Sequence, residues 1–343
     1  MLSKILPFNR TLLKKDWIIN RSNVYIVILI FLIAGPYSAF GKVQDYYSSL
    51  DRARDIHDFY FRIQDVEEVL HMGVLYTMMF IFPAVVSALI TGEEKRKRTI
   101  EISIGAPYSR YTVFFNKMVL GIFVTILPVL ISGGILLLMS MTSGAFSSMV
   151  SLRSILFLMF KCMMIGISVF SFSTLIGMIC SSFPLQAFLT LVFILFPIGF
   201  VGLLSENLRV WGIDINFYEL GIMDFAESIT PGLHFGKLIR MDGHTAVFFG
   251  LGLLCLALLL MTVSGILFDI YAVERGPEAL TFTQTEPIFR IGVVLCSILL
   301  CGLLVDQIIR GYGGRTGVLL GYIIGGALGY LIPRALIMKN RVA

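Results

Sequence analysis

The sequence predicts an all-α polytopic membrane protein. Hydrophobic types make up 57% of the 343 residues and charged types 14%, whereas a soluble domain carries about 25% charged residues. The mean hydropathy is +0.87, and the apolar residues gather in runs that suit membrane-crossing helices. These observations disfavour a soluble globule, a disordered chain and a protein that binds nucleic acid.

Eight apolar runs approach or reach the roughly 20 residues that a helix needs to cross a bilayer. The predicted spans are residues 24–40, 72–92, 118–140, 154–180, 185–204, 246–268, 291–309 and 317–337. Several contain proline, which we interpret as a kink because neighbouring helices and hydroxyl side chains can satisfy the backbone groups that proline frees. The first span is short, and Gly35 and Pro36 stand near its outer end.

The distribution of basic residues predicts that both termini are cytoplasmic. With the N-terminus inside, the inner connections together with Arg334 hold 16 Lys and Arg against 8 Asp and Glu, and the remainder holds 11 against 14. The basic run 95–98 would lie outside in the inverted arrangement, contrary to the positive-inside rule. We therefore expect a multi-pass protein of the cell membrane.

The N-terminal segment 1–23 is predicted to hold a short interfacial helix over residues 7–22. Its basic side chains and Trp17 suit the headgroup zone, where long cationic chains and indoles anchor. A basic tail that only fixes topology is an equal alternative.

Two outer connections are predicted to be helical. Residues 41–71 show apolar residues at helical spacing between acids, which indicates an amphipathic helix on the outer surface. Residues 205–245 are too long for a turn and are interrupted by Pro231 and Gly232. A pair of short re-entrant helices is expected there, because non-helical backbone at membrane depth must be covered by protein.

The inner connection 93–117 combines charge with an apolar edge. Ile100 and Ile104 stand one turn apart and could face a partner, a helix is expected to end near Pro107, and Ser109 can cap the next helix. The alternative is that the charges only orient the chain.

Chemical motifs are sparse in the sequence. The phosphate-binding spacing GxxxxGK[ST] is absent, and the five cysteines are interpreted as small buried hydrophobes. Lys161 and Asp306 lie nearest to a span interior, and a solvated or loop-paired role is favoured for both. The last span carries a four-residue ladder that indicates close helix packing. Its members are Gly317, Gly321, Gly325 and Gly329.

The order of these parts resembles the permease subunit of type-2 ATP-binding-cassette exporters. The inner connection matches that family's pattern of Gly-Glu, a basic and acidic run, Thr, an apolar residue and Glu, followed by Pro-x-Ser-Arg. The matching positions are Gly92, Glu93, Arg98, Thr99, Ile100, Glu101, Pro107, Ser109 and Arg110. One departure is Arg98, where the family usually has Gly. The resemblance covers about residues 1–268, and residues 274–290 are similar to larger permeases of Gram-positive bacteria that are linked to envelope stress and antimicrobial peptides.

The resemblance implies a six-helix core over 24–268, a cytoplasmic connection over 269–290, and two additional spans with a short tail over 291–343. It implies that the inner connection docks in a cleft of a separate ATPase subunit. The residues expected there are Glu93, Glu94, Arg98, Thr99, Ile100, Glu101, Ile104, Pro107, Ser109 and Arg110.

The resemblance also implies that ATP hydrolysis and membrane transport are carried out by different chains. No catalytic, metal or cofactor site is expected in this chain, because ATP and Mg²⁺ would bind the partner ATPase. A second permease chain, identical or paralogous, is expected beside it, and the cargo would be a lipid, peptide, antibiotic or envelope-related amphiphile. Two alternatives stay open, namely a membrane sensor or scaffold that does not transport, and a polytopic membrane enzyme.

Overall fold

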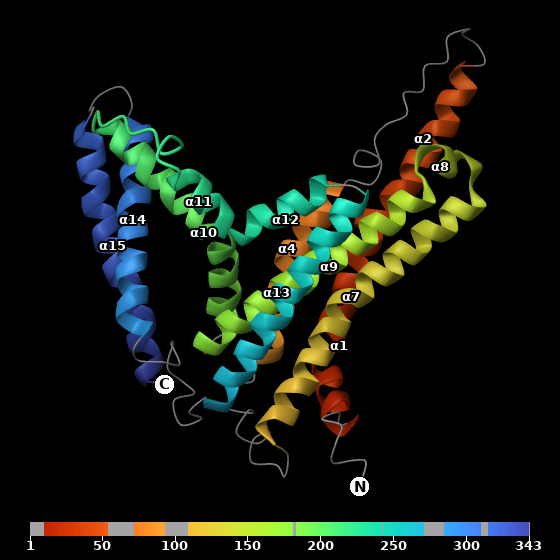
Figure 1. Ribbon diagram of the computed structural model, residues 1–343, viewed down its shortest axis with the longest axis horizontal. Helices are drawn as coiled ribbons and strands as arrows, with labels where there is room; N and C mark the ends of the chain where they lie inside the picture. The colour runs from red at the N-terminus through yellow and green to blue at the C-terminus, as the bar shows by residue number, and fades with distance from the viewer. Residues whose placement is uncertain are drawn as a thin grey trace.

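The computed structural model describes residues 10–53, 72–92, 109–180, 183–241, 243–270, 285–309 and 315–342, which are largely helical (Figure 1). The helices are α1 (Arg10–Leu32), η2 (Ile33–Tyr37), α2 (Ser38–Ala53), α4 (Met72–Ser87), η3 (Ala88–Gly92), α7 (Arg110–Thr142), α8 (Gly144–Met149), α9 (Leu152–Ile179), α10 (Phe183–Val210), α11 (Ile222–Ile229), α12 (Pro231–Arg240), α13 (Gly243–Ile270), α14 (Thr285–Ile309) and α15 (Arg315–Val342). The predicted all-α membrane fold is confirmed.

Seven helices are long and apolar enough to cross a membrane. They coincide with the first seven predicted spans, and three of them, in α7, α10 and α13, extend further at both ends. The eighth predicted span falls in α15, whose described apolar part, Thr316–Leu331, is shorter. Eight spans therefore remain a prediction. The five cysteines are free thiols. Cys162 and Cys180 are buried as expected, whereas Cys296 and Cys301 are half-buried and Cys255 of α13 is exposed.

The first span is longer than the sequence suggested, running over Val24–Ser48. Gly35 and Pro36 do not end the helix, because the chain passes through them as the π-helical turn η2. In a π-helix the N–H of residue 36 would bond the carbonyl of Phe31, and proline has no N–H. The Ser132 hydroxyl of α7 donates to that carbonyl instead, at 3.2 Å.

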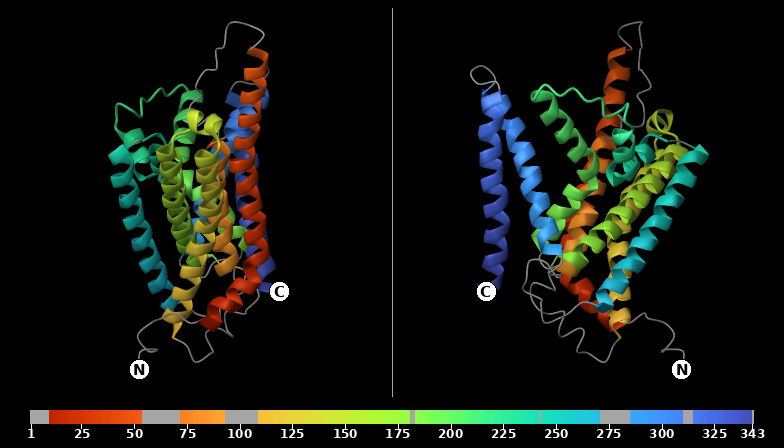
Figure 2. Two further views of the ribbon diagram at one scale, coloured as in Figure 1. Left: turned by 90° about the vertical axis from the view of Figure 1, so that its right-hand side faces the viewer. Right: turned by 60° about the vertical axis from the view of Figure 1, so that its left-hand side comes forward.

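The predicted N-terminal helix continues into the first span without a break at residue 23. Its first turns are tilted relative to the upright remainder (Figure 2). Leu12 and Asp16 are buried, one turn apart, and Lys117 of α7 lies 3.8 Å from the Asp16 carboxylate and is itself buried. The start of α1 is therefore held against α7 by a buried ion pair as well as by apolar contact.

The most buried of the seven spans is α9, which packs against α4, α7, α10 and α13. Helices α14 and α15 pack closely on each other and meet the rest of the described bundle through α10. Figure 1 shows this pair standing to one side of the other spans. We call α1–α13 the core and α14 with α15 the C-terminal pair.

The outer connection after α10 holds the expected two short helices, α11 and α12. Thr230 lies between them, is fully buried, and accepts a hydrogen bond from the Ile198 N–H at 3.1 Å. Ile198 follows Pro197, and Figure 1 shows α10 bending in its middle. At about 1.5 Å rise per residue, Ile198 is roughly 18 Å from the end of α10 at Val210. The turn between the short helices thus reaches the middle of a membrane span.

Candidate functional site

The inner end of the bundle is the end at which α1 and α7 begin and η3 and α13 finish (Figure 1). The distribution of basic residues predicts that this end faces the cytoplasm. Of the predicted ATPase-contact residues, those from Glu93 to Pro107 lie outside the described residues. Ser109 and Arg110 are described.

Ser109 and Arg110 fix the point at which the predicted contact segment joins α7. Ser109 is the N-cap of α7, and its hydroxyl accepts from the Thr112 N–H at 3.1 Å, as the sequence predicted. The Arg110 guanidinium donates to the Asp269 carbonyl near the end of α13 at 2.8 Å. A cation at a helix C-terminus is stabilised by the helix dipole. The contact segment therefore leads into α7 at a point where α7 is bonded to the end of α13.

The opposite border of the contact segment is η3, which ends at Gly92. A Cβ built on Gly92 would lie 2.9 Å from the Cα of Phe183, the first residue of α10. Only glycine allows two backbones to approach this closely. Gly92, which matches the family pattern, thus brings the contact segment directly to the start of α10.

Six polar side chains gather behind η3, and we call them the inner junction. They come from three spans and are at most 4% exposed. They are Ser87 and Thr91 of α4 and η3, Ser173 and Thr174 of α9, and Gln186 and Thr190 of α10. Buried polar groups are stable in such a place only when they are hydrogen-bonded to each other or to backbone.

Gln186 stands at the centre of the inner junction. Its amide nitrogen donates to the Ser173 carbonyl at 2.9 Å and to the Ser87 hydroxyl at 3.1 Å. Its amide oxygen accepts from the Thr91 hydroxyl at 3.0 Å, and Thr91 shares the same proton with the Ser87 carbonyl at 2.8 Å. One side chain therefore links η3 and α4 to α9 through α10.

A second polar cluster, the outer junction, joins α10 to the C-terminal pair. The buried Asn207 amide donates to the Leu299 carbonyl of α14 at 3.1 Å and accepts from the Tyr322 hydroxyl of α15 at 2.8 Å. Trp211 donates to the same hydroxyl at 3.1 Å and stacks on the Tyr322 ring. This cluster attaches the C-terminal pair to the core.

The predicted glycine ladder lies between the two helices of the C-terminal pair. All four glycines are buried. A Cβ built on Gly321 or Gly325 would collide with α14 backbone, including the Gly302 Cα at 2.7 Å and the Ile298 Cα at 2.8 Å, respectively. On Gly329 it would lie 2.8 Å from the Val294 Cα. The ladder therefore permits backbone contact between α14 and α15.

Lys161 of α9 is buried and has a loop partner. Its ammonium donates to the Ile239 carbonyl near the end of α12 at 2.9 Å. This bond ties the outer helix pair to the core, in accord with the loop-paired role that the sequence favoured. Asp306 is half-buried in α14.

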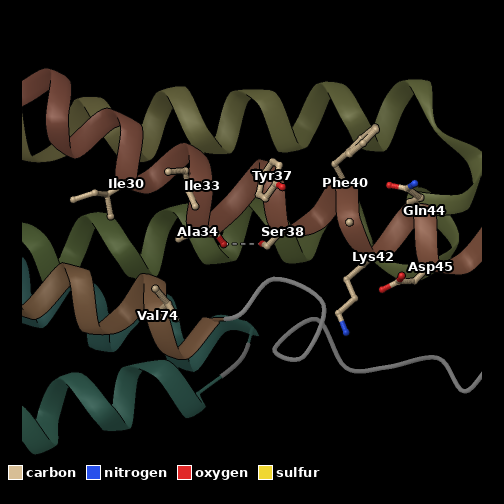
Figure 3. Close-up of a pocket in the computed structure, with 11 residues that line it drawn as sticks. Ile30, Ile33, Ala34, Tyr37, Ser38, Phe40, Lys42, Gln44, Asp45 and Val74 are labelled. Atoms are coloured by element: carbon tan, nitrogen blue, oxygen red, sulfur yellow. Dashed lines mark hydrogen bonds between the residues drawn. The ribbon is translucent and has the colours of Figure 1, made fainter.

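A groove of about 650 Å³ runs along the first span, with Val74 of α4 on its opposite side (Figure 3). One end is lined by Ile30 and Ile33, and the other by Lys42 and Asp45. Its volume lies in the range of about 300–1,000 Å³ that ligand pockets show. An apolar groove with charged side chains at one end suits the binding of an amphiphile.

Sequence reasoning missed both junctions and the buried pair of Asp16 with Lys117. The hydroxyl of a serine or threonine in a membrane helix can donate to the carbonyl four residues back in its own helix. The presence of these residues in a sequence therefore does not indicate a contact with another helix. A weak signal existed for Gln186, because an amide inside an apolar run needs partners. Within the described ranges, no three His, Cys, Asp or Glu side chains come together to hold a metal ion.

A family model described as ABC-2 family transporter protein matches residues 19–202. The match begins within α1, includes both borders of the contact segment, and ends in the outer half of α10. It is shorter than the resemblance drawn from the sequence, since it stops before α11. No curated protein and no solved structure matches the chain.

Proposed function

The chain belongs to the ABC-2 family of transporter proteins, and on that premise we propose that it is the membrane-spanning subunit of an ATP-driven exporter. ATP would be hydrolysed by separate cytoplasmic ATPase subunits that contact residues 93–110. The observation that carries this proposal is the anchoring of both borders of that segment. On one side Thr91 belongs to the inner junction and Gly92 packs against the start of α10. On the other side Ser109 caps α7 and Arg110 joins α7 to α13.

Such anchoring suits a segment that transmits force. A displacement of residues 93–108 would act on α4, α7, α10 and α13 together, because each of these helices begins or ends beside it. ATP-driven closure of two ATPase subunits could then shift the spans of this chain against those of a second permease chain. A ligand shifts such an equilibrium only through its different affinities for the two states.

The groove on the first span supports an amphiphilic cargo. Ile30, Ile33 and Val74 offer apolar contact at membrane depth, and Lys42 offers a cation that could pair with an acidic headgroup. Tyr37 lies between the two ends and is 72% exposed, so a phenol is available to a bound molecule. A photoactivatable anionic phospholipid should therefore crosslink to the peptide containing Tyr37, and this crosslinking should fall in Lys42→Gln. Crosslinking that spreads evenly over all lipid-facing spans would argue against a cargo route here.

The first test of the proposal is affinity purification of the natively expressed protein in mild detergent, followed by mass spectrometry. A stoichiometric ATPase subunit is expected, and a second permease in the same complex would identify a heterodimer. If the protein is monodisperse and no ATPase accompanies it, the sensor or scaffold alternative becomes the better explanation.

The second test is the double variant Ile100→Ala/Glu101→Ala. It should weaken ATPase binding and uncouple hydrolysis from transport while leaving the spans folded. The matched control is Ile213→Ala/Asp214→Ala, which changes an exposed apolar–acidic pair in the outer connection. Equal ATPase recovery in all three proteins would contradict the assignment of residues 93–110.

A further inference from the structure

We propose that Gln186 is the positioning residue that transmits movement of the ATPase-contact segment to α9 and α10. The inference rests on the proposed function and adds a specific residue to it. Thr91 stands two residues before Glu93, where the contact segment begins. Its single hydroxyl proton is shared between the Ser87 carbonyl, four residues back at 2.8 Å, and the Gln186 amide oxygen at 3.0 Å. Gln186 lies in the first turn of α10, so the bond joins the entrance of the segment directly to the inner end of that helix.

The hydrogen-bond network fixes the orientation of the Gln186 amide. A carbonyl can only accept, so the atom 2.9 Å from the Ser173 carbonyl must be the amide nitrogen. That nitrogen also donates to Ser87, whose own proton is then free to reach Thr174 at 3.0 Å. Thr174 donates in turn to the Phe170 carbonyl at 2.8 Å. The donors and acceptors thus form one ordered chain from α10 through α4 into α9.

Glycine makes room for this amide from the side of α9. A Cβ built on Gly177 would overlap the Gln186 amide, with its carbonyl carbon at 2.6 Å. Together with the close approach of Gly92 to Phe183, this leaves the side chain enclosed on two sides. The amide is therefore held by steric contact and by hydrogen bonds, and it cannot follow a moving partner without moving its own helix.

Movement at η3 has a defined consequence further along α10. This helix bends at Pro197, where the Ile198 N–H donates to Thr230 of the outer helix pair. A pull on Thr91 would reach the inner half of α10 through Gln186, and the outer helix pair through the kink. A π-helical turn such as η3 is frequently found at functional sites, because its weaker hydrogen bonding allows local adjustment. The path therefore connects the ATPase-contact segment to the outer face.

The test uses the complete complex with its ATPase subunits in liposomes. Leu220, 61% exposed in the outer connection, is changed to Cys, and its labelling by a membrane-impermeant maleimide is followed with and without ATP and Mg²⁺. Thr91→Val replaces the hydroxyl by a methyl of similar size. It should reduce the ATP-dependent change in labelling rate by about threefold, the effect expected when one interhelical hydrogen bond of average strength is lost.

Two matched variants separate positioning from general damage. Thr125→Val makes the same change at a buried threonine of α7 whose hydroxyl bonds the Gly121 carbonyl of its own helix. It should leave the ATP response unchanged. Thr91→Ser keeps a hydroxyl and should restore the response, which a role in packing alone would not predict.

Gln186→Leu should reduce the ATP response at least as much as Thr91→Val, and the double variant should be no worse than Gln186→Leu alone. If Gln186→Leu does not fold, Thr91→Val carries the test. A full ATP response in Thr91→Val, or an equal loss in Thr125→Val, would overturn the inference while leaving the transporter assignment intact. If the parent complex binds no ATPase or shows no ATP response, the proposed function fails, and the inference falls with it.

Discussion

The two buried junctions of α10 differ in the way that they hold their neighbours. The inner junction contains six polar side chains from three spans and lies within the tightly packed core. The outer junction depends on Asn207, with Tyr322 and Trp211 around it, and binds a pair of helices that meets the described core chiefly along α10. The helices of the core are thus connected to one another at many points, whereas the C-terminal pair is connected to the described core chiefly at α10.

We therefore expect the C-terminal pair to separate from the core before the core itself unfolds. The chain's two tryptophans report on these two parts separately. Trp17 packs against Phe123 in the core, with ring centres 6.3 Å apart, and Trp211 stacks on Tyr322 of the C-terminal pair. Thermal unfolding in detergent can therefore be followed in Trp211→Phe and Trp17→Phe backgrounds. We expect the Trp211 signal to change at the lower temperature.

The largest effect is expected from a methyl group inside the C-terminal pair. Gly325→Ala would place a Cβ against the backbone at Ser297 and Ile298, and overpacking of this kind costs about 3 kcal/mol. Gly326→Ala is the matched control, because its Cβ would make ordinary contact at 3.7 Å with the Ile298 side chain. Gly325→Ala should lower the unfolding temperature reported by Trp211 and leave that reported by Trp17. Equal effects of the two alanines would show that α14 and α15 are not in backbone contact.

A smaller effect is expected where the outer helix pair joins the core. Lys161→Met removes the bond to the Ile239 carbonyl, and hydrogen bonds of charged groups contribute about 1.5–3 kcal/mol. Trp17 should report the loss, since α9 belongs to the core, and the outer helix pair should become more sensitive to protease. Lys237→Met, at an exposed position of α12, serves as the control and should change neither property. Resistance to protease in Lys161→Met would mean that the turn at Thr230 holds the pair without help.

The sequence predicted the parts of this fold that depend on patterns of residues close together in the chain. The first seven spans follow from runs of apolar residues, the cap at Ser109 follows from its position before a helix, and the ladder beginning at Gly317 follows from four-residue spacing. The break at Pro231 marked the two short helices of the outer connection. Each of these features is set by residues within a few turns of one another.

The contacts that the sequence did not reveal join residues far apart in the chain. Thr91 and Gln186 are separated by 95 positions, and Asn207 and Tyr322 by 115. Their pairing depends on how the spans are arranged, which residue type alone does not encode. Pro36 illustrates the same limit, because the Phe31 carbonyl that its missing N–H leaves open accepts a hydrogen bond from Ser132 of α7, 101 positions further along the chain. The predicted contact residues from Glu93 to Pro107 remain a prediction.

Asn207→Leu tests whether the outer junction holds the C-terminal pair on the core. It removes the bonds to Leu299 and Tyr322, and interhelical hydrogen bonds in membrane proteins contribute about 1–2 kcal/mol in model peptides. The unfolding temperature reported by Trp211 should fall and that reported by Trp17 should not. Asn216→Leu, at an exposed position in the same outer connection, is the control. A matching fall in both signals would mean that the C-terminal pair is an integral part of the core.

The smallest effect is expected inside the core at the kink of the first span. Ser132→Ala removes the donor to the Phe31 carbonyl and should cost about 0.6 kcal/mol, visible in the Trp17 signal alone. The same serine limits the space beside Gly35, where a Cβ would lie 2.6 Å from its hydroxyl oxygen. Gly35→Ala should therefore destabilise the core more than Ser132→Ala does, and the double variant should recover part of that loss. Strict additivity of the two changes would contradict the contact, because independent sites add and neighbours do not.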